Sequence, residues 1–268
     1  MTKLPKEVID LMNVFSKNKY QIFVVGGAVR DALLNKVVDN CDFTTNATPE
    51  QIQKLIPDSF YNNIYGTVTV RALRTMPQQN LLFEVTPFRR ESEYTDLRHP
   101  EKIEWAKTVE EDLSRRDFTI NSMAYDGKNI VDPYFGQKDL FNKLIKAVGD
   151  PDKRFNEDAL RLLRAVRFTS QLGFLIEDNT RNSIQKNAFL ITKISWERIR
   201  DEFLKILESD HPAEGILFLK NTGLLAYILP EVDTCFSIPQ KSPKRHHIYD
   251  VGTHLVMALK HCPSKDPI

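Results

Sequence analysis

The spacing of apolar and polar residues changes near residue 150. Before it, helical spacing over 5–18 is followed by an apolar run at 22–25, a glycine pair and a further helical segment. Residues 64–74 and 81–89 are rich in Val, Thr, Phe and Leu with partial alternation, which predicts two adjacent strands with a turn at 75–80. The first half therefore predicts strands mixed with helices.

One helix of this half has a clear start signal. Thr48 precedes Pro49, and Gln51 follows three residues after the threonine. A threonine cap, a proline in the first helical position and a glutamine at the third position are typical of a capping box. The sequence therefore predicts that a helix starts after Thr48.

After about residue 150 the strand signals stop. Helical spacing is found over 157–172, 178–189, 195–209, 212–222 and 246–262. The predicted fold class is α+β, with a head domain over 1–148 and an all-helical neck and body over 149–268. Residues 90–105 are charged and nearly free of aliphatic side chains, which predicts a mobile loop.

Composition narrows the class of protein. The chain has 268 residues, 41% hydrophobic and 27% charged, which is typical of a globular protein. No apolar run approaches the ~18 residues of a membrane span, and the N-terminus lacks the apolar core of a secretory signal, so the cytoplasm is the expected location. Three widely spaced cysteines without a CxxC pair indicate neither a disulfide framework nor a zinc site.

Charge gives no global argument for nucleic-acid binding, because 37 Lys and Arg residues face 36 Asp and Glu residues. A local site is suggested by Gly26 and Gly27 at a strand end, since glycines let a backbone approach a phosphate group closely. Alternation along the next extended segment places Asn40 and Asp42 on one face, as a grip on a divalent metal requires, and Asp39 on the other. A simple turn between strand and helix is the alternative interpretation of the glycines.

Five motifs make the picture specific: GGAVRDALL at 26–34, CDFTTNATPE at 41–50, RRDFTINSMAY at 115–125, RFNEDALRLLRAVRF at 154–168 and SWERI at 195–199. In this order they resemble the class II tRNA nucleotidyltransferases, the CCA-adding enzymes and their poly(A) polymerase relatives. The resemblance implies a polymerase-β-like head with a mixed β-sheet. It also implies template-independent addition of CMP and AMP from CTP and ATP to the tRNA 3′ end, with release of pyrophosphate and binding of the acceptor stem and elbow.

The same resemblance implies a two-metal site that holds Mg²⁺, with Mn²⁺ as a possible substitute. Asp42 matches the second acidic residue of the family's DxD motif, while the first falls on Asn40, whose neutral amide offers an oxygen ligand without a charge. Glu84 resembles a third acidic group, and an exposed strand carboxylate is the alternative. The sequence thus predicts a catalytic site with one negative charge fewer than the family motif.

Nucleotide contacts are implied for two further segments of the head. Arg30 is positioned to meet the triphosphate oxygens, whereas the neighbouring Asp31 has a structural interpretation. In the RRDFTIN segment, a carboxylate can accept a hydrogen bond from the ribose 2′-hydroxyl. The candidate ligands there are Arg115, Arg116, Asp117 and Asn121.

In the helical half, Asp158 and Arg161 lie three residues apart on a predicted helix and are therefore neighbours on one face. An acceptor beside a planar donor can match the amine and ring nitrogen of both cytosine and adenine, and the resemblance implies this role as a protein template. Arg164 and Arg167 continue the spacing as further nucleotide-site candidates. Leu160, Leu163 and Phe168 are expected in the core, and the predicted supporting residues are Glu157, Glu197 and Arg198.

The C-terminal segment 244–268 resembles the start of an HD phosphohydrolase domain, but the chain ends before the required His-Asp pair. Helical spacing makes a metal site geometrically possible, although we do not expect one, with His246, His247, Asp250 and His254 as its candidate ligands. CC-adding, A-adding and poly(A)-adding activities remain open. So do a catalytically silent tRNA-binding protein, which Asn40 permits, and a metal-dependent phosphohydrolase; the sequence does not determine the oligomeric state.

Overall fold

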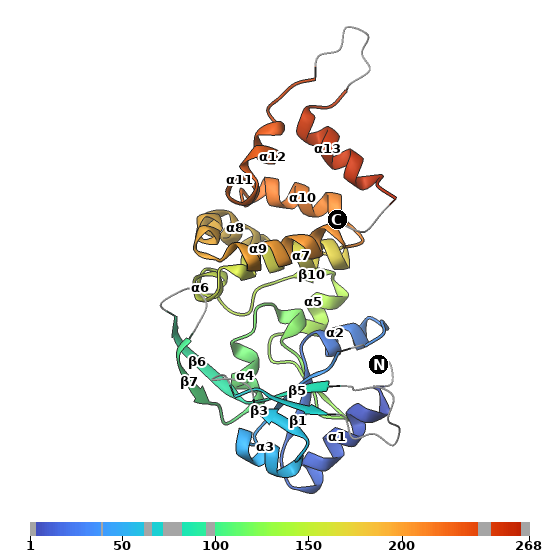
Figure 1. Cartoon of the computed structure of the whole chain (residues 1–268), viewed down its shortest axis with the longest axis vertical. Helices are drawn as coiled ribbons and strands as arrows, with labels where there is room; N and C mark the ends of the chain where they lie inside the picture. The colour runs from blue at the N-terminus through green and yellow to red at the C-terminus, as the bar shows by residue number, and fades with distance from the viewer. Residues whose placement is uncertain are drawn as a thin grey trace. The chain divides into compact units, whose positions relative to one another are not determined.

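The structure is a computed structural model that describes residues 4–38, 40–61, 66–71, 82–94, 100–240 and 248–263, with only the backbone described for 91–94 and 100–103. The described residues form two compact units (Figure 1). The first contains residues up to Glu93 together with Pro100–Asn142, and the second consists mainly of residues from Lys143 onward. This division falls six residues before the predicted boundary between 148 and 149.

A mixed sheet organises the first unit. Within the described residues it has seven strands in the order β3-β4-β5-β2-β1-β8-β9. In this sheet β2 and β5 pair in parallel, whereas the other neighbouring strands pair antiparallel, so the sheet is mixed. The strands are β1 (Ile22–Val25), β2 (Asp42–Thr45), β3 (Ser59–Tyr61), β4 (Val68–Arg71), β5 (Leu82–Pro87), β8 (Ala124–Tyr125) and β9 (Ile130–Val131).

Side-chain alternation gives this sheet two different faces. One face packs against α1 (Lys6–Lys17), α2 (Gly27–Leu33) and α3 (Pro49–Leu55) through a core that includes Val24 and Phe43. The other packs against α4 (Val109–Ser114) through a smaller core that includes Val25 and Leu113. The capping box predicted for α3 is confirmed, since Thr48 and Gln51 satisfy each other's backbone donors.

The described residues of the segment 90–105 differ from the prediction of a mobile loop. β6 (Arg89–Tyr94) and β7 (Pro100–Trp105) pair as a two-stranded ribbon, while residues 95–99 lie outside the described residues. The ribbon is formed by backbone hydrogen bonds rather than by an apolar face. At its base, Ala106 N donates to Phe88 O at 2.8 Å. Strand pairing satisfies backbone groups whatever the side chains, so a charged segment can form a ribbon.

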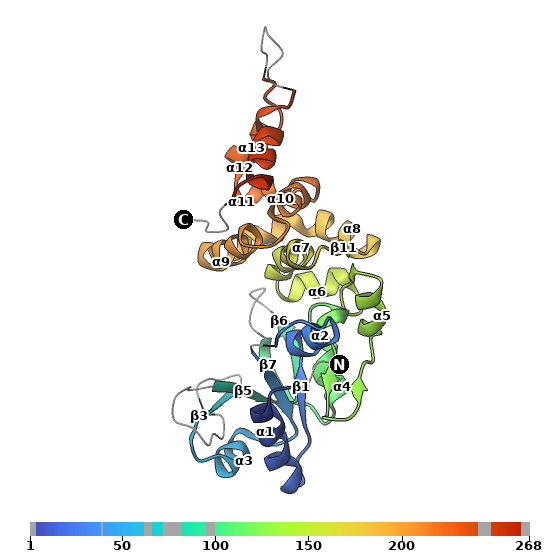
Figure 2. The same ribbon diagram turned by 90° about the vertical axis from the view of Figure 1, so that its right-hand side faces the viewer.

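The second unit is built from helices, but it is not entirely helical as predicted. Leu144–Ile145 (β10) and Leu175–Ile176 (β11) form a short parallel pair. Figure 2 shows the helices from a second side. They are α6 (Pro151–Glu157), α7 (Leu160–Leu172), α8 (Asp178–Asn187), the 3-10 segment η2 (Ala188–Lys193), α9 (Trp196–Leu207), α10 (Pro212–Asn221), α11 (Leu225–Ile228), α12 (Pro230–Cys235) and α13 (Val251–Lys260).

The helix predicted over 157–172 is α7, which begins three residues later than predicted, at Leu160, and ends at Leu172 as predicted. Asp158 has φ −142° and ψ 105°, so the chain is extended between the end of α6 and the start of α7. Leu160, Leu163 and Phe168 are buried as expected. In the described part of the chain, the structure has no helix long and apolar enough to cross a bilayer.

Candidate active site

Asp42 and Glu84 are neighbours on the sheet face that α4 partly covers. In the parallel pair β2·β5 they are direct partners, and Asp42 is also the partner of Val25 in β1. Residues paired in this way point to the same side of a sheet. Asp42 and Glu84 are both exposed, whereas Val25 on the same face is buried in the smaller core.

Asn40 precedes β2 and continues its alternation. Asn40 and Asp42 are exposed, whereas Cys41 between them is buried, so the predicted grouping of residues 40 and 42 fits the observed exposure. Burial and the nearby charge of Asp42 raise the pKa of the Cys41 thiol to about 11. Cys41 is therefore a packed side chain rather than a nucleophile. Asp39, the alternative to Asn40, lies outside the described residues.

The surroundings of Asp42 are partly desolvated although its side chain reaches solvent. This loss of water raises the pKa of Asp42, and the charge of Arg116 acts in the opposite direction. The chemistry of these side chains fits Mg²⁺, which prefers oxygen ligands: Asp42 and Glu84 offer carboxylate oxygens, and Asn40 offers an amide oxygen. Among the described residues no cluster of three or more His, Cys, Asp or Glu side chains is placed to hold a metal, so this set has two carboxylates and depends on the amide.

The turn at Gly26, directly after β1, lies close to Arg116. Gly26 has φ 71°, a backbone conformation that residues other than glycine rarely adopt. A Cβ at this position would lie 3.0 Å from Arg116 Nη1. Gly26 is thus required by its backbone and by the arginine beside it, while Gly27 begins the short helix α2.

Arg30 on α2 is held from two sides. Its Nε and Nη2 donate to the two carboxylate oxygens of Asp31, both at 2.9 Å, and its Nη1 donates to Asn121 Oδ1 at 2.8 Å. Asn121 is itself fixed, since its Nδ2 donates to Asp117 Oδ1 at 3.3 Å. Asp31 and Asn121 therefore orient Arg30, and Asp117 is buried behind them.

Arg115 and Arg116 share a carboxylate that sequence reasoning did not single out. Asp112 on α4 is fully buried. Its Oδ1 accepts from Arg115 Nε at 3.0 Å and Nη2 at 2.9 Å, and its Oδ2 accepts from Arg116 Nη2 at 3.4 Å. Burial alone would raise the pKa of Asp112, but the charges of both arginines and their hydrogen bonds outweigh it and hold that pKa below the usual value.

In the second unit, Glu157 joins two arginines. Arg154 Nη2 donates to Glu157 Oε1 at 2.6 Å, and Arg161 Nη1 donates to Glu157 Oε2 at 2.7 Å. Arg161 Nη1 also donates to the carbonyl of Arg154 at 3.1 Å. The side chain of Arg161 is consequently fixed by α6 rather than by Asp158.

Asp158 is held by Arg198 of α9 and by the first turn of α7. Its carboxylate accepts from Arg198 Nη2 at 3.1 Å and from Leu160 N at 3.1 Å. The prediction that Asp158 and Arg161 share one helical face is wrong, because Asp158 has extended backbone and lies before α7. Arg198, predicted as a support, supplies the ion pair instead.

Arg164 and Arg167 lie over the ring of Phe168, at 5.4 Å and 4.2 Å from its centroid. Arg167 Nε also forms a 2.6 Å ion pair with Glu202 on α9, where the Glu202 carboxylate is 6% exposed. This contact favours a packing role for Arg167 between α7 and α9. Glu197 is exposed in the first turn of α9.

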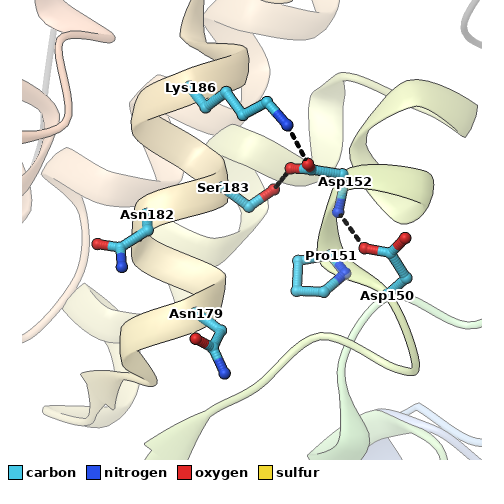
Figure 3. Close-up of a pocket in the computed structure, with 7 residues that line it drawn as sticks. All are labelled: Asp150, Pro151, Asp152, Asn179, Asn182, Ser183 and Lys186. Atoms are coloured by element: carbon cyan, nitrogen blue, oxygen red, sulfur yellow. Dashed lines mark hydrogen bonds and ion pairs between the residues drawn. The ribbon is translucent and has the colours of Figure 1, made fainter.

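A polar pocket of about 280 Å³ lies where α6 meets α8 (Figure 3). Asp152 is central in it and accepts hydrogen bonds from Ser183, Lys186 and Asn187. Because α8 already supplies these donors, Asp152 fixes the start of α6 on α8. The pocket is lined by Asp150, Pro151, Asp152, Asn179, Asn182, Ser183 and Lys186.

The possible metal site near the C-terminus has no support in the described residues. Asp250 caps α13, where its carboxylate accepts from Thr253 N and Thr253 Oγ1, both at 2.7 Å. His254 lies within α13, while His246 and His247 lie outside the described residues. Asp250 thus has a sufficient structural role as a helix cap.

Comparisons with known proteins match both units. Residues 22–146 match the poly A polymerase head domain, and residues 173–236 match the probable RNA and SrmB-binding site of polymerase A. A CCA-adding enzyme of Lactobacillus helveticus is 44% identical over 227 residues, which are 83% of this chain and 55% of the relative. The chain belongs to the poly(A) polymerase and tRNA nucleotidyltransferase family.

Solved structures of this family show the same fold. The CCA-adding enzyme of Bacillus stearothermophilus in complex with CTP aligns with a TM-score of 0.76 at 34% identity, over 86% of this chain and 56% of that one. A tRNA nucleotidyltransferase complexed with a primer tRNA and an incoming ATP analog aligns with a TM-score of 0.68 at 26% identity, over 85% and 66%. The chain spans about half the length of the curated family members that it matches.

Two charged residues of this family member escaped the sequence analysis. Asp112 lies three and four residues before Arg115 and Arg116, and Arg154 lies three residues before Glu157. These spacings place each acid and its bases on one side of a helical turn. They were a usable signal for ion pairs, but spacing does not reveal that Asp112 is fully buried.

Proposed function

We propose that this chain catalyses template-independent nucleotidyl transfer from CTP and ATP to the 3′ end of tRNA. The single observation that supports this most directly is the pairing of Asp42 with Glu84 beside Arg116 and the Gly26 turn. The arginine suits the oxygens of a triphosphate whose α-phosphate is attacked by a hydroxyl, and the two carboxylates would hold the divalent ions that neutralise its charge. The proposal includes the cytoplasmic location, where tRNA and both triphosphates are present.

In the proposed reaction the tRNA 3′-hydroxyl attacks the α-phosphate in line, and pyrophosphate leaves. Arg30 and Arg116 hold the triphosphate by charge-assisted hydrogen bonds, because their guanidinium groups lie near the strand ends that carry Asp42. Gly26 leaves room for the phosphates and for Arg116. Asp117 is proposed to accept from the ribose 2′-hydroxyl, which would favour ribonucleotides.

Asp42, Glu84 and the amide oxygen of Asn40 are the residues that would hold Mg²⁺. When bound, divalent ions lower the pKa of the attacking hydroxyl and neutralise the charge of the leaving pyrophosphate. The chain's own contribution is to hold two carboxylates in fixed sheet register, so that the oxygen ligands need little reorganisation.

Base selection is proposed for Asp158 and Arg161, although each is held by a different partner. Arg198 fixes the Asp158 carboxylate and Glu157 fixes the Arg161 guanidinium. An acceptor and a donor held independently can still match the edge of cytosine or adenine. The tRNA is proposed to lie along the helical unit through phosphate contacts, so its binding should weaken as salt increases.

The decisive test is incorporation of labelled CTP and ATP, separately and together, onto tRNAs that lack the whole CCA end, that lack the last adenosine, or that are complete. Addition of both nucleotides in sequence is the expected result. Addition of one nucleotide type would identify a CC-adding or A-adding enzyme, and long adenosine tails would identify a poly(A) polymerase. No incorporation with Mg²⁺ or Mn²⁺ would contradict the catalytic proposal.

A silent nucleotide-binding and tRNA-binding protein is the second candidate, and the observation that favours it is Asn40 at the exposed position beside Asp42. Loss of one charge weakens the attraction for each cation that the residue would share. This candidate predicts that CTP binds without transfer. Transfer by the unaltered chain would exclude it.

Arg198→Gln should reduce base selection. Without the guanidinium, the Asp158 carboxylate loses a charged hydrogen bond at 3.1 Å, a contact worth about 1.5–3 kcal/mol. We expect the KM for CTP to increase about tenfold or more and UTP incorporation to rise, as measured by single-nucleotide extension. Arg200→Gln is the matched control, since Arg200 is an exposed arginine of the same helix that pairs with Asp201. Equal KM values in the two variants would contradict the prediction.

A further inference from the structure

Arg115 and Arg116 are adjacent in the chain but are bound very differently. Arg115 gives two donors to one oxygen of Asp112, at 3.0 and 2.9 Å. Arg116 reaches the other oxygen through one donor at 3.4 Å, and its buried Nε has no hydrogen-bond partner within the described residues. Arg115 is thus the close counter-ion of Asp112, whereas Arg116 keeps donor capacity that the described residues leave unsatisfied.

Arg116 lies next to Gly26, at the end of β1, and near Asp42, at the start of β2. Its Nη1 comes within 3.0 Å of the position of a Cβ at Gly26, and its charge acts on Asp42. A second anionic contact would therefore complete its hydrogen bonding where a triphosphate is expected. Asp112 lies behind it, without exposure to solvent.

Asp112 also joins Arg116 to the β6–β7 ribbon. Arg89 N, at the start of β6, donates to Asp112 Oδ1 at 3.4 Å. The same oxygen receives both donors of Arg115, so one buried carboxylate connects the base of the ribbon, α4 and the arginine pair. A buried carboxylate bound from three sides has a fixed position, which makes it suitable for aiming a flexible side chain.

We propose that Asp112, neutralised by Arg115, is a positioning residue that aims Arg116 at the triphosphate of the incoming nucleotide. The inference rests on the proposed function in that it takes a triphosphate as the ligand. It assigns the two arginines different tasks: Arg115 compensates the buried charge, and Arg116 binds the phosphate oxygens.

In Asp112→Asn, the electrostatic effect and the loss of positioning should change the affinity for an anion in opposite directions. Asp112→Asn removes a negative charge near the arginines, so electrostatics alone would tighten the binding of an anion. Loss of positioning would weaken it. We expect the dissociation constant for inorganic tripolyphosphate, measured by titration calorimetry at fixed ionic strength, to increase about tenfold in Asp112→Asn, because a misaimed arginine loses charge-assisted hydrogen bonds.

Two further variants separate positioning from folding. Leu113→Ala removes a fully buried side chain of the same helix without changing any charge, so it should lower the melting temperature but leave tripolyphosphate affinity within about twofold. Arg116→Gln should weaken tripolyphosphate binding at least as much as Asp112→Asn does. If Asp112→Asn binds as tightly as the unaltered chain or more tightly, or if Leu113→Ala weakens binding equally, the positioning role is overturned.

The outcome can be separated from that of the proposed function, because tripolyphosphate binding needs neither tRNA nor a base. A chain whose tripolyphosphate affinity depends on Asp112 but that extends no tRNA would retain this inference and lose the proposed function. If the chain extends tRNA but the tripolyphosphate affinity is unchanged in Asp112→Asn, the proposed function stands and this inference is lost. Absence of tripolyphosphate binding by the unaltered chain would overturn the inference, whether or not tRNA is extended.

Discussion

Asp42→Asn is expected to reduce nucleotide incorporation by about a thousandfold or more, because it removes the carboxylate at the centre of the proposed metal site. Asp42 is the direct partner of Glu84 in β5 and of Val25 in β1, so no other described carboxylate occupies that register position. The amide keeps the shape of the side chain but cannot supply the negative charge. The measurement is the rate of CMP addition to a tRNA without its CCA end, at saturating CTP.

The loss should not come from unfolding. Desolvation raises the pKa of Asp42, which means that the folded protein disfavours its ionised form relative to water. An uncharged amide avoids this cost, so the melting temperature of Asp42→Asn at pH 7 should be unchanged or higher. Glu110→Gln, at an exposed position of α4, is the control and should keep full activity. More than a tenth of the original rate in Asp42→Asn would remove Asp42 from the proposed mechanism.

Asn40→Asp is expected to strengthen divalent-metal binding about tenfold and to increase transfer at limiting Mg²⁺. A single charge facing a divalent ion at roughly 4 Å in water-like surroundings contributes about 2 kcal/mol, part of which is lost to repulsion from Asp42 and Glu84. Titration calorimetry with Mn²⁺, in the presence of a CTP analogue that cannot react, measures the binding. The Mg²⁺ dependence of CMP addition measures its consequence.

Asn35→Asp is the matched control for this gain. Asn35 is also exposed and lies in the same connection between α2 and β2, but at φ 56° it belongs to the turn after α2. It should leave Mn²⁺ affinity unchanged. An equal gain in both variants would mean that general electrostatics, rather than coordination by residue 40, explains the effect. No gain in Asn40→Asp would exclude residue 40 as a ligand.

Features with local causes could be predicted from the sequence. β1 covers Ile22–Val25 as the apolar run predicts, and α1 covers Lys6–Lys17 within the predicted 5–18. The start of α3 follows from Thr48, Pro49 and Gln51, which act on one another within a single turn. In each case the side chains that determine the element lie within a few residues of it.

The β6–β7 ribbon and the break at Asp158 were not predictable in this way. The ribbon has no apolar alternation; it is formed by backbone pairing, and Arg89 at its base donates to Asp112. The periodicity over 157–172 continues through Asp158, although its backbone is extended there. Periodicity records which faces are buried and does not fix the first residue of a helix, so the start of α7 at Leu160 could not be predicted from it.

The sequence by itself determined the family motifs, the strands β1, β2, β4 and β5 with the helices α1 to α3 of the head, and the kinds of side chain available for chemistry. Only the tertiary structure decided which of them meet: Asp42 with Glu84 across β2·β5, Arg161 with Glu157, and Asp158 with Arg198. The physical reason is that a charged side chain takes the partner that burial and backbone geometry bring within hydrogen-bond distance. Spacing along the chain limits that choice only within one continuous helix or strand.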